Sequence, residues 1–400
     1  MIPYGKHYID EDDITAVVDV LRNGWITQGP KVPELEAAIS NFVGSSYAVA
    51  VSSATAALHI AYLAAGLGKD SKVVTTPNTF VASANCILYG GGIPIFCDIN
   101  PLSLNMDVQN FEDIFEKERH ITAVIPVHFG GLPCDMNKIH NIASSHGIKV
   151  IEDASQAFGA KYDDGSLVGN CKYSDMTVFS LHPVKGITSG EGGIITTNNK
   201  ILYNRLLSLR SHGINKGNFE LLGTNAGDQN FINPDMAFSE GIVNPWYYEM
   251  QELGFNYRIT DFQCALVLSQ LNKSNMFMRR RKEIAYQYDE LLGSLENVSL
   301  TQTGTRNQSS NHLFVVRIDF DEIGKKRGQV MRELSVNGIG TQVHYIPVTR
   351  QPYYVELGFI PEDYPEVEKY YSQALTIPIF YGLESGQIED IVKHLKAVVS

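Results

Sequence analysis

The feature that most constrains the fold is an alternation of short apolar runs with helical segments between residues 47 and 151. Near-continuous apolar runs of this kind are typical of strands in a parallel sheet, because such strands are buried on both faces. The segments between the runs are long enough to be crossover helices. The predicted strands are Tyr47–Val51, Val73–Thr76, Ile93–Cys97, Ala123–Val127 and Ile148–Ile151. The sequence therefore predicts one large α/β domain.

Two strand ends in this part of the chain carry candidate functional side chains. Ile148–Ile151 leads into Asp153, and a second apolar run ends in Ser180 and, after a proline, Lys185. Ligands of open α/β sheets bind at the carboxyl ends of strands. A lysine held between a buried strand and a glycine-rich turn loses hydration and becomes a better amine nucleophile. Taken singly, a lysine such as Lys185 is usually a solvated loop residue, and Asp153 is equally explained as a helix cap.

The turn Ser52–Thr55 is a third candidate, because it joins a predicted strand to a predicted helix at Ala56–Ala65. At such a helix start, free backbone N–H groups and the helix dipole favour an anion such as phosphate. Ser and Thr also cap most helices, so the turn alone leaves both interpretations open. A lysine, a carboxylate and a phosphate-binding turn are together the groups required by pyridoxal 5'-phosphate (PLP) chemistry.

The segments VIEDASQAFGA and FSLHPVKGITSGEGGIITTN, which begin at Val150 and Phe179, resemble the sugar aminotransferases of the DegT/StrS type. These enzymes are a branch of the fold-type I PLP enzymes, and the resemblance extends over nearly the whole chain. It implies an α/β fold with a large aspartate aminotransferase-like PLP-binding domain, residues 1–250. An interdomain helix and a smaller α+β C-terminal domain, residues 251–400, would follow. It also implies a homodimer, with Lys185 as the catalytic residue that holds the cofactor covalently.

The resemblance implies further roles around the cofactor phosphate and ring. Ala54, Thr55 and Ser180 would hold the phosphate, together with Asn256 of the partner subunit. By sequence alone, Asn256 is equally a turn residue.

Around the ring, the resemblance implies that Phe80 stacks on the pyridine, with Asp153 behind it. Asp153 would keep the pyridine nitrogen protonated. Gln156 would contact the ring hydroxyl. Core packing is the alternative for Phe80.

Within the family, the chain is most similar to the 4-aminotransferases of the pseudaminic acid pathway. The segments that carry this similarity include Leu209–Ile214, Pro245–Glu249, Gln251–Arg258 and His344–Pro347. The similarity implies L-glutamate as amino donor. The acceptor would be a nucleotide sugar, a UDP-linked 4-keto-6-deoxy-N-acetyl-hexose that is aminated at C4.

Two residues of the last segment, His344 and Tyr345, would line the substrate cleft, although aromatic clusters of this kind also pack domain interfaces. Two positions depart from the subgroup pattern. Leu181 stands where Phe is usual, and Gln156 stands where this subgroup often has His. Both departures bear on the tilt of the cofactor rather than on proton transfer.

Other functions remain open at this level. A PLP-dependent dehydratase or epimerase would share the cofactor, and a non-catalytic regulator would bind a nucleotide sugar without turnover. Another nucleotide-sugar aminotransferase would use a dTDP- or GDP-linked sugar, or a ketone at C3. Dehydratases of this family carry His in place of the lysine, so Lys185 favours an aminotransferase. The long aperiodic segment Ile214–Tyr248 is interpreted as a lid or partner contact.

Composition excludes several other classes of function. The net charge is 32 − 44 = −12, which argues against nucleic acid and anionic membrane surfaces as partners. The five cysteines are widely spaced, and no Cys-x-x-Cys or His-Glu-x-x-His pattern occurs, so neither a disulfide framework nor a metal site is expected. Without a signal-peptide core or an apolar run of membrane-spanning length, the sequence predicts a cytoplasmic protein.

Overall fold

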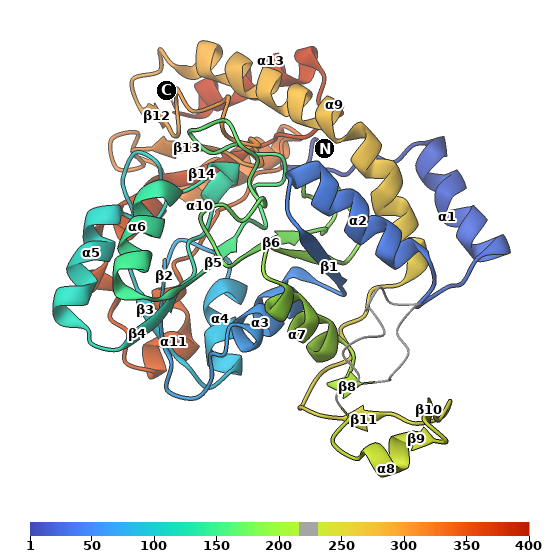
Figure 1. Cartoon of the computed structure of the whole chain (residues 1–400). Coiled ribbons are helices and arrows are strands. Elements are labelled where there is room, and N and C mark those ends of the chain that lie inside the picture. The colour runs from blue at the N-terminus through green and yellow to red at the C-terminus, as the bar shows by residue number, and fades with distance from the viewer. Residues whose placement is uncertain (216–230, 400) are drawn as a thin grey trace.

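A seven-stranded sheet forms the centre of the larger part of the molecule (Figure 1). The computed structural model describes residues 1–215 and 231–399. The strands are β1 (Tyr47–Val51), β2 (Lys72–Thr75), β3 (Ile93–Phe96), β4 (Ile121–Val124), β5 (Lys149–Asp153), β6 (Met176–Ser180) and β7 (Gly193–Thr197). Their order across the sheet is β1-β7-β6-β5-β4-β2-β3.

Strand β7 is the exception to the predicted parallel arrangement. The neighbours from β3 to β6 pair in parallel, as predicted. In contrast, β7 runs antiparallel to both β1 and β6. Residues 181–192 join β6 to β7 without a helix. A connection between two parallel neighbouring strands needs a long crossover, usually a helix. The loop 181–192 forms no such crossover, so β7 runs back antiparallel beside β6.

Helices cover both faces of the sheet (Figure 1). One face carries α2 (Lys31–Val43), α5 (Val108–Lys117) and α6 (Met136–His146). The other face carries α3 (Ala54–Ala64), α4 (Ala82–Tyr89) and α7 (Lys200–Arg210). Helix α3 is buried over most of its length, which fixes its N-terminus against the edge of the sheet. This placement matters for the site described below.

The long helix α9 (Asp261–Leu292) connects the two cores of the molecule. It contributes Val267 to the core beside the large sheet and Tyr288 to a second core. The predicted helix in this region is confirmed, and α1 (Glu11–Asn23) packs against it. Among the described residues, no helix combines the length and apolar character needed to cross a membrane.

The second core belongs to an antiparallel sheet of β12 (Val298–Leu300), β13 (Phe314–Ile318) and β14 (Ala374–Ile377). Helices α10 (Arg327–Val336) and α13 (Ser385–Val399) pack on it, and α11 (Pro352–Glu356) and α12 (Pro365–Gln373) lie in the same half of the chain. The division into residues 1–250 and 251–400 stays a prediction, because α9 enters both cores.

The sequence also predicts a strand at Gly340–Val343, and this prediction is wrong, because the structure forms only an isolated bridge there. The backbone N–H of Gly340 donates to the Ile2 carbonyl (2.7 Å), and Gln342 forms an isolated bridge with Thr376. The N-terminal segment therefore takes hydrogen bonds that a strand at 340–343 would have used. The third strand is the fully buried β14, which the sequence prediction missed.

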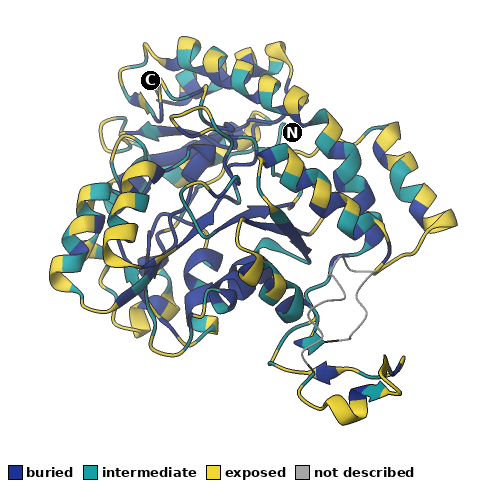
Figure 2. Cartoon of the chain, in the orientation of Figure 1, coloured by how far each residue is buried: buried dark blue, intermediate teal, exposed yellow. Residues whose placement is uncertain are grey.

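The described part of the segment Ile214–Tyr248 contains short elements rather than continuous loop. They are β8 (Ile214–Asn215), α8 (Pro234–Ala237), β9 (Phe238–Ser239) and β10 (Ile242–Val243), and β11 (Glu249–Met250) pairs with β8. These elements project from the body of the molecule, and Figure 2 shows that most of this projection is exposed. Residues 216–230 of the predicted lid lie outside the described residues.

Candidate active site

Lys185 lies in the loop that joins β6 to β7, where its backbone N–H donates to the His182 carbonyl (2.9 Å). Its Nζ is 3.4 Å from Nε2 of His312. The pKa of Lys185 is lowered to about 8, mainly by burial; the charge of Asp153 opposes this change, and that of Arg281 contributes to it. A much larger fraction of this amine is therefore neutral near pH 7 than of an ordinary lysine. A neutral amine is the form that a nucleophile or a base requires.

Asp153 ends the adjacent strand β5 and is buried. Its Oδ2 accepts a hydrogen bond from Ser83 Oγ (2.6 Å), and its Oδ1 accepts one from the Ser155 backbone N–H (3.0 Å). The carboxylate is close enough to Lys185 to favour its protonated form. The structure thus brings together the acid and the amine that the sequence placed at neighbouring strand ends.

The predicted phosphate turn lies at the same edge of the sheet. Ala54 and Thr55 are the first residues of α3, and Ser53 caps the helix through its side chain. Ser180 pairs with Gly193, and a Cβ on Gly193 would lie only 2.5 Å from the Ser53 carbonyl oxygen. Only glycine allows this close approach, which places Ser180 near the helix N-terminus. A helix start beside a hydroxyl suits an anion.

Phe80 and Gln156 have different surroundings. The Phe80 ring is 59% exposed, so core packing does not explain it, and its centroid lies 6.3 Å from that of Tyr345. The Gln156 amide is engaged at both ends: Oε1 accepts from the Gly130 N–H, and Nε2 donates to the Tyr345 hydroxyl, both at 2.7 Å. This second bond, which links the segment after β5 to the segment before β14, was missed at the sequence level.

His344 and Tyr345 lie beside these residues. His344 is buried, with Nδ1 2.9 Å from Thr376 Oγ1. Burial and the nearby charge of Lys185 lower the pKa of His344 to about 3, so its ring is neutral. Burial raises the pKa of the Tyr345 hydroxyl, which therefore stays protonated. Both side chains are uncharged hydrogen-bonding groups; His344 lies close to Lys185, and Tyr345 lies close to Asp153.

Asn256 is exposed and bridges Ser211 through the backbone. Two residues later, Arg258 bridges Val51 at the end of β1. Asn256 therefore lies towards the edge of the sheet that carries the phosphate turn. Its assignment to a site shared with the partner subunit stays a prediction.

A buried polar network secures the end of β5, and the sequence prediction missed it. Glu152 Oε2 contacts His128 Nε2 (2.8 Å) and accepts from the Tyr162 hydroxyl (2.7 Å). Its other oxygen accepts from the hydroxyls of Ser174 and Thr177. Burial opposes ionisation of Glu152, but these partners hold its pKa below the usual range. A buried strand carboxylate requires such partners, although the sequence does not say which they are.

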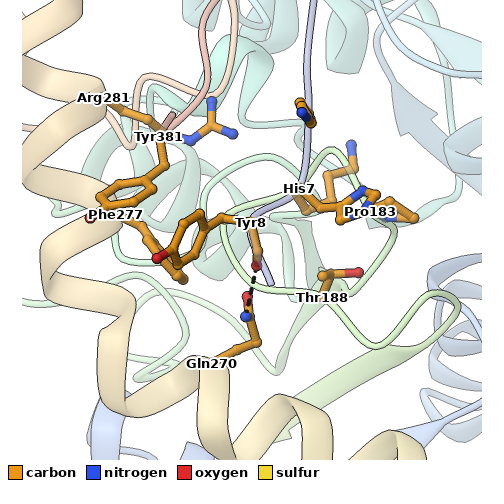
Figure 3. A pocket seen from close by; sticks show the side chains of 11 residues that line it. His7, Tyr8, Pro183, Thr188, Gln270, Phe277, Arg281 and Tyr381 are labelled. Atoms are coloured by element: carbon orange, nitrogen blue, oxygen red, sulfur yellow. Dashed lines mark hydrogen bonds between the residues drawn. The ribbon is translucent and has the colours of Figure 1, made fainter. Parts of the chain in front are cut away.

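A small cavity lies behind the Lys185 loop, and Figure 3 shows its lining. The N-terminal segment contributes Tyr8, whose carbonyl accepts from Gln270 Nε2 of α9 (3.0 Å). Arg281, also on α9, donates to the carbonyls of Ile379 (3.0 Å) and Val184 (3.4 Å). Helix α9 therefore contacts the lysine loop through Arg281, and the N-terminal segment, which is bonded to α9, lines the same cavity.

Comparison with known proteins decides the family. Residues 7–396 match the model of the DegT/DnrJ/EryC1/StrS aminotransferase family. The chain belongs to this family. SpsC of Bacillus subtilis, a spore coat polysaccharide biosynthesis protein, is 32% identical over all 400 residues and 97% of its own length.

Two solved structures confirm the predicted α/β fold of this aminotransferase. One is Helicobacter pylori PseC, an aminotransferase involved in the biosynthesis of pseudoaminic acid. It is 26% identical, with a TM-score of 0.87 over 99% of this chain and 98% of its own. The other is the PLP form of Streptococcus pneumoniae Spr1654, which is described as a sugar aminotransferase. It is 27% identical, with a TM-score of 0.86 over 100% of this chain and 98% of its own. The protein is thus a PLP-dependent sugar aminotransferase.

The residues at the site fit this cofactor. Lys185 supplies an amine with a lowered pKa, and Asp153 supplies a buried carboxylate. Ser180 and the start of α3 offer donors for a phosphate, and Phe80 presents an exposed ring face.

Proposed function

We propose that this enzyme transfers the amino group of L-glutamate to C4 of a UDP-linked 4-keto-6-deoxy-N-acetyl-hexose, in a pathway of the pseudaminic acid type. The observation that carries the proposal is the similarity to PseC along the whole chain. The proximity of His344, from the segment shared with that subgroup, to Lys185 adds support, as does the proximity of its neighbour Tyr345 to Asp153.

The chemistry divides between two buried residues. Bound PLP would supply an electron sink for cleavage of the C–H bond next to the amino group. Asp153 would hold a proton on the ring nitrogen, because a buried carboxylate favours a neighbouring cation. Lys185 would carry the cofactor and, once released, take the proton from the α-carbon of the donor. In the second half-reaction it would return a proton to the sugar carbon.

The remaining residues would position the cofactor. Ala54, Thr55 and Ser180 would donate hydrogen bonds to the phosphate, and Phe80 would cover one face of the ring. Gln156 keeps one amide N–H beyond its two protein contacts, and this N–H would reach the ring hydroxyl.

We also propose a homodimer in which Asn256 of the partner subunit completes each phosphate site. Exposed apolar side chains lie on the segment before Asn256, at Met250 and Leu253, and on the segment that bonds to the start of α9, at Trp25 and Ile26. Surfaces of this kind mark interfaces. We further propose that each subunit consists of two domains, residues 1–250 and 251–400.

The site residues and their environment favour a substrate with many hydroxyl groups. The uncharged donors and acceptors of His344 and Tyr345 suit a sugar and its nucleotide. The five cysteines, Cys86, Cys97, Cys134, Cys171 and Cys264, are free and buried, which suits the reducing cytoplasm that we propose as the location.

The test is to supply the PLP-loaded enzyme with L-glutamate and nucleotide sugars that carry a ketone at C4 or C3, and to follow release of 2-oxoglutarate. We expect the UDP-linked 4-keto sugar to be the best acceptor, and Lys185→Ala to release no 2-oxoglutarate. If the enzyme prefers a C3 ketone, or a dTDP- or GDP-linked sugar, the proposed acceptor is wrong and the preferred sugar takes its place. The similarity to SpsC makes a different sugar the main alternative.

A further inference from the structure

His312 is a buried residue beside Lys185 to which none of the roles above is assigned. It lies between β12 and β13, yet its backbone docks on the large domain. Its N–H donates to the Gly130 carbonyl (2.9 Å), and the Ser310 N–H donates to the Gly131 carbonyl (3.0 Å). Its own carbonyl accepts from Arg281 Nη1 (3.3 Å). These bonds fix the position from which the imidazole faces the amine.

The two ring nitrogens of His312 differ in their surroundings. Nε2 lies 3.4 Å from Lys185 Nζ. Nδ1 is buried and has no hydrogen-bond partner among the described residues. A histidine kept only for packing would be expected to satisfy both nitrogens. The unpaired atom is therefore a cost that a functional role would explain.

The charges around His312 determine which protonation state it adopts. Burial and the positive charges of Lys185 and Arg281 hold the pKa of His312 well below its usual range, and His344 and His182 add to this. The carboxylate that faces the cluster is Asp153, which acts on Lys185. The imidazole is thus neutral at pH 7, and a neutral ring has one nitrogen that accepts a hydrogen bond.

We propose that His312 is a positioning residue for Lys185: its Nε2 accepts an N–H of the ε-amine and thereby directs the amine lone pair towards the reacting carbon. When the C–H bond of the donor breaks, the proton moves to this lone pair and the bonding electrons stay with the substrate and cofactor. The resulting ammonium keeps its hydrogen bond to His312 and would then give the proton to the cofactor carbon that bears the transferred nitrogen, which leaves the ε-amine neutral again. The inference rests on the proposed function only for the identity of the donor.

The experiment compares His312→Phe, which keeps the ring shape but cannot accept, with His312→Gln, whose amide reaches the position of Nε2. His140→Phe is the matched control, because His140 lies on α6 and contacts the Tyr173 carbonyl, away from the site. In each holoenzyme, the half-reaction with L-glutamate and with α-deuterated L-glutamate is followed by absorbance. A second assay labels Lys185 in the cofactor-free protein with an amine-reactive reagent across pH.

We expect His312→Phe to slow the half-reaction by about 10- to 100-fold. Its KM for glutamate and its cofactor content should be unchanged, and its deuterium isotope effect should be larger. The labelling midpoint of Lys185 should fall by about 1 pH unit, because a phenyl ring cannot stabilise the ammonium. His312→Gln should recover part of both properties, and His140→Phe should match wild type.

A wild-type rate and isotope effect in His312→Phe, or an unmoved labelling midpoint, would overturn the inference. If His312→Phe does not fold, His312→Gln and His312→Asn decide, because only Gln reaches the Nε2 position; equal rates would contradict the proposal. If the wild-type enzyme does not react with L-glutamate, then L-glutamate is not the amino donor, and the proposed function fails rather than the inference about His312. The labelling assay is independent of that outcome, because it needs neither donor nor cofactor.

Discussion

Replacing Glu152 with Gln should destabilise the fold strongly, although the substitution preserves shape. Glu152 is fully buried, and adjacent residues of a strand point to opposite faces, so its side chain lies away from that of Asp153. Nδ1 of His128 accepts from the Cys134 N–H (3.2 Å), so the ring proton lies on Nε2 and points at Glu152. If the Gln amide nitrogen took this position, two hydrogen-bond donors, the amide N–H and the His128 Nε2–H, would face each other without an acceptor.

The magnitude follows from the hydrogen bonds that the substitution removes. The charge-assisted contact with His128 is lost, and a contact with Tyr162 weakens or must reverse. A buried donor left without a partner costs about 1–3 kcal/mol, so two affected groups predict a loss of about 2–5 kcal/mol. Denaturant titration at fixed protein concentration measures it. Glu34→Gln, at an exposed pair with Lys31, is the control and should lie close to wild type.

The effect should also depend on pH with a defined sign. The pKa of Glu152 is lowered in the folded state, so its contribution is complete above the unfolded value of about 4.3. That contribution is lost as pH falls through the lower folded value, and the gap between variant and wild type should narrow there. A difference in the free energy of unfolding between wild type and Glu152→Gln below about 1 kcal/mol at pH 7 would refute the assigned role of this carboxylate. A difference that stays the same in acid would also refute it.

Three further experiments test the site. Asp153→Asn should retain cofactor absorbance but lose at least about tenfold in turnover, or ~1.4 kcal/mol, and a smaller loss would contradict its assignment. Arg281→Met removes a buried cation and should raise the pKa of Lys185 above about 8, measured by pH-dependent labelling; a lower midpoint would be the wrong sign. Mixed Asn256→Ala and Lys185→Ala subunits should recover activity in hybrid dimers, whereas no recovery would argue against shared sites.

The sequence predicted those parts of the site that come from consecutive strands and the turns after them. Asp153 and Lys185 were placed correctly because parallel strands bring their carboxyl ends to one edge. His312 could not be found in this way. It lies 127 residues from Lys185, and the backbone hydrogen bonds of residues 310–312 to Gly130 and Gly131 bring it to the amine.

The errors in the fold have similar causes. The strand expected at 340–343 had a suitable pattern, but the Gly340 backbone pairs with the N-terminal segment instead. The reversed direction of β7 depends on the path of a loop, which side-chain periodicity does not encode. The bond from Gln156 to Tyr345 likewise joins two residues that are 189 positions apart in the sequence.

The most direct test of the account is to identify the lysine that holds the cofactor. Borohydride reduction of the PLP-loaded enzyme fixes the covalent link, and peptide mapping by mass spectrometry then locates it. The account predicts a pyridoxyl group on Lys185, the buried amine whose pKa is lowered to about 8. A pyridoxyl group on any other lysine would contradict it.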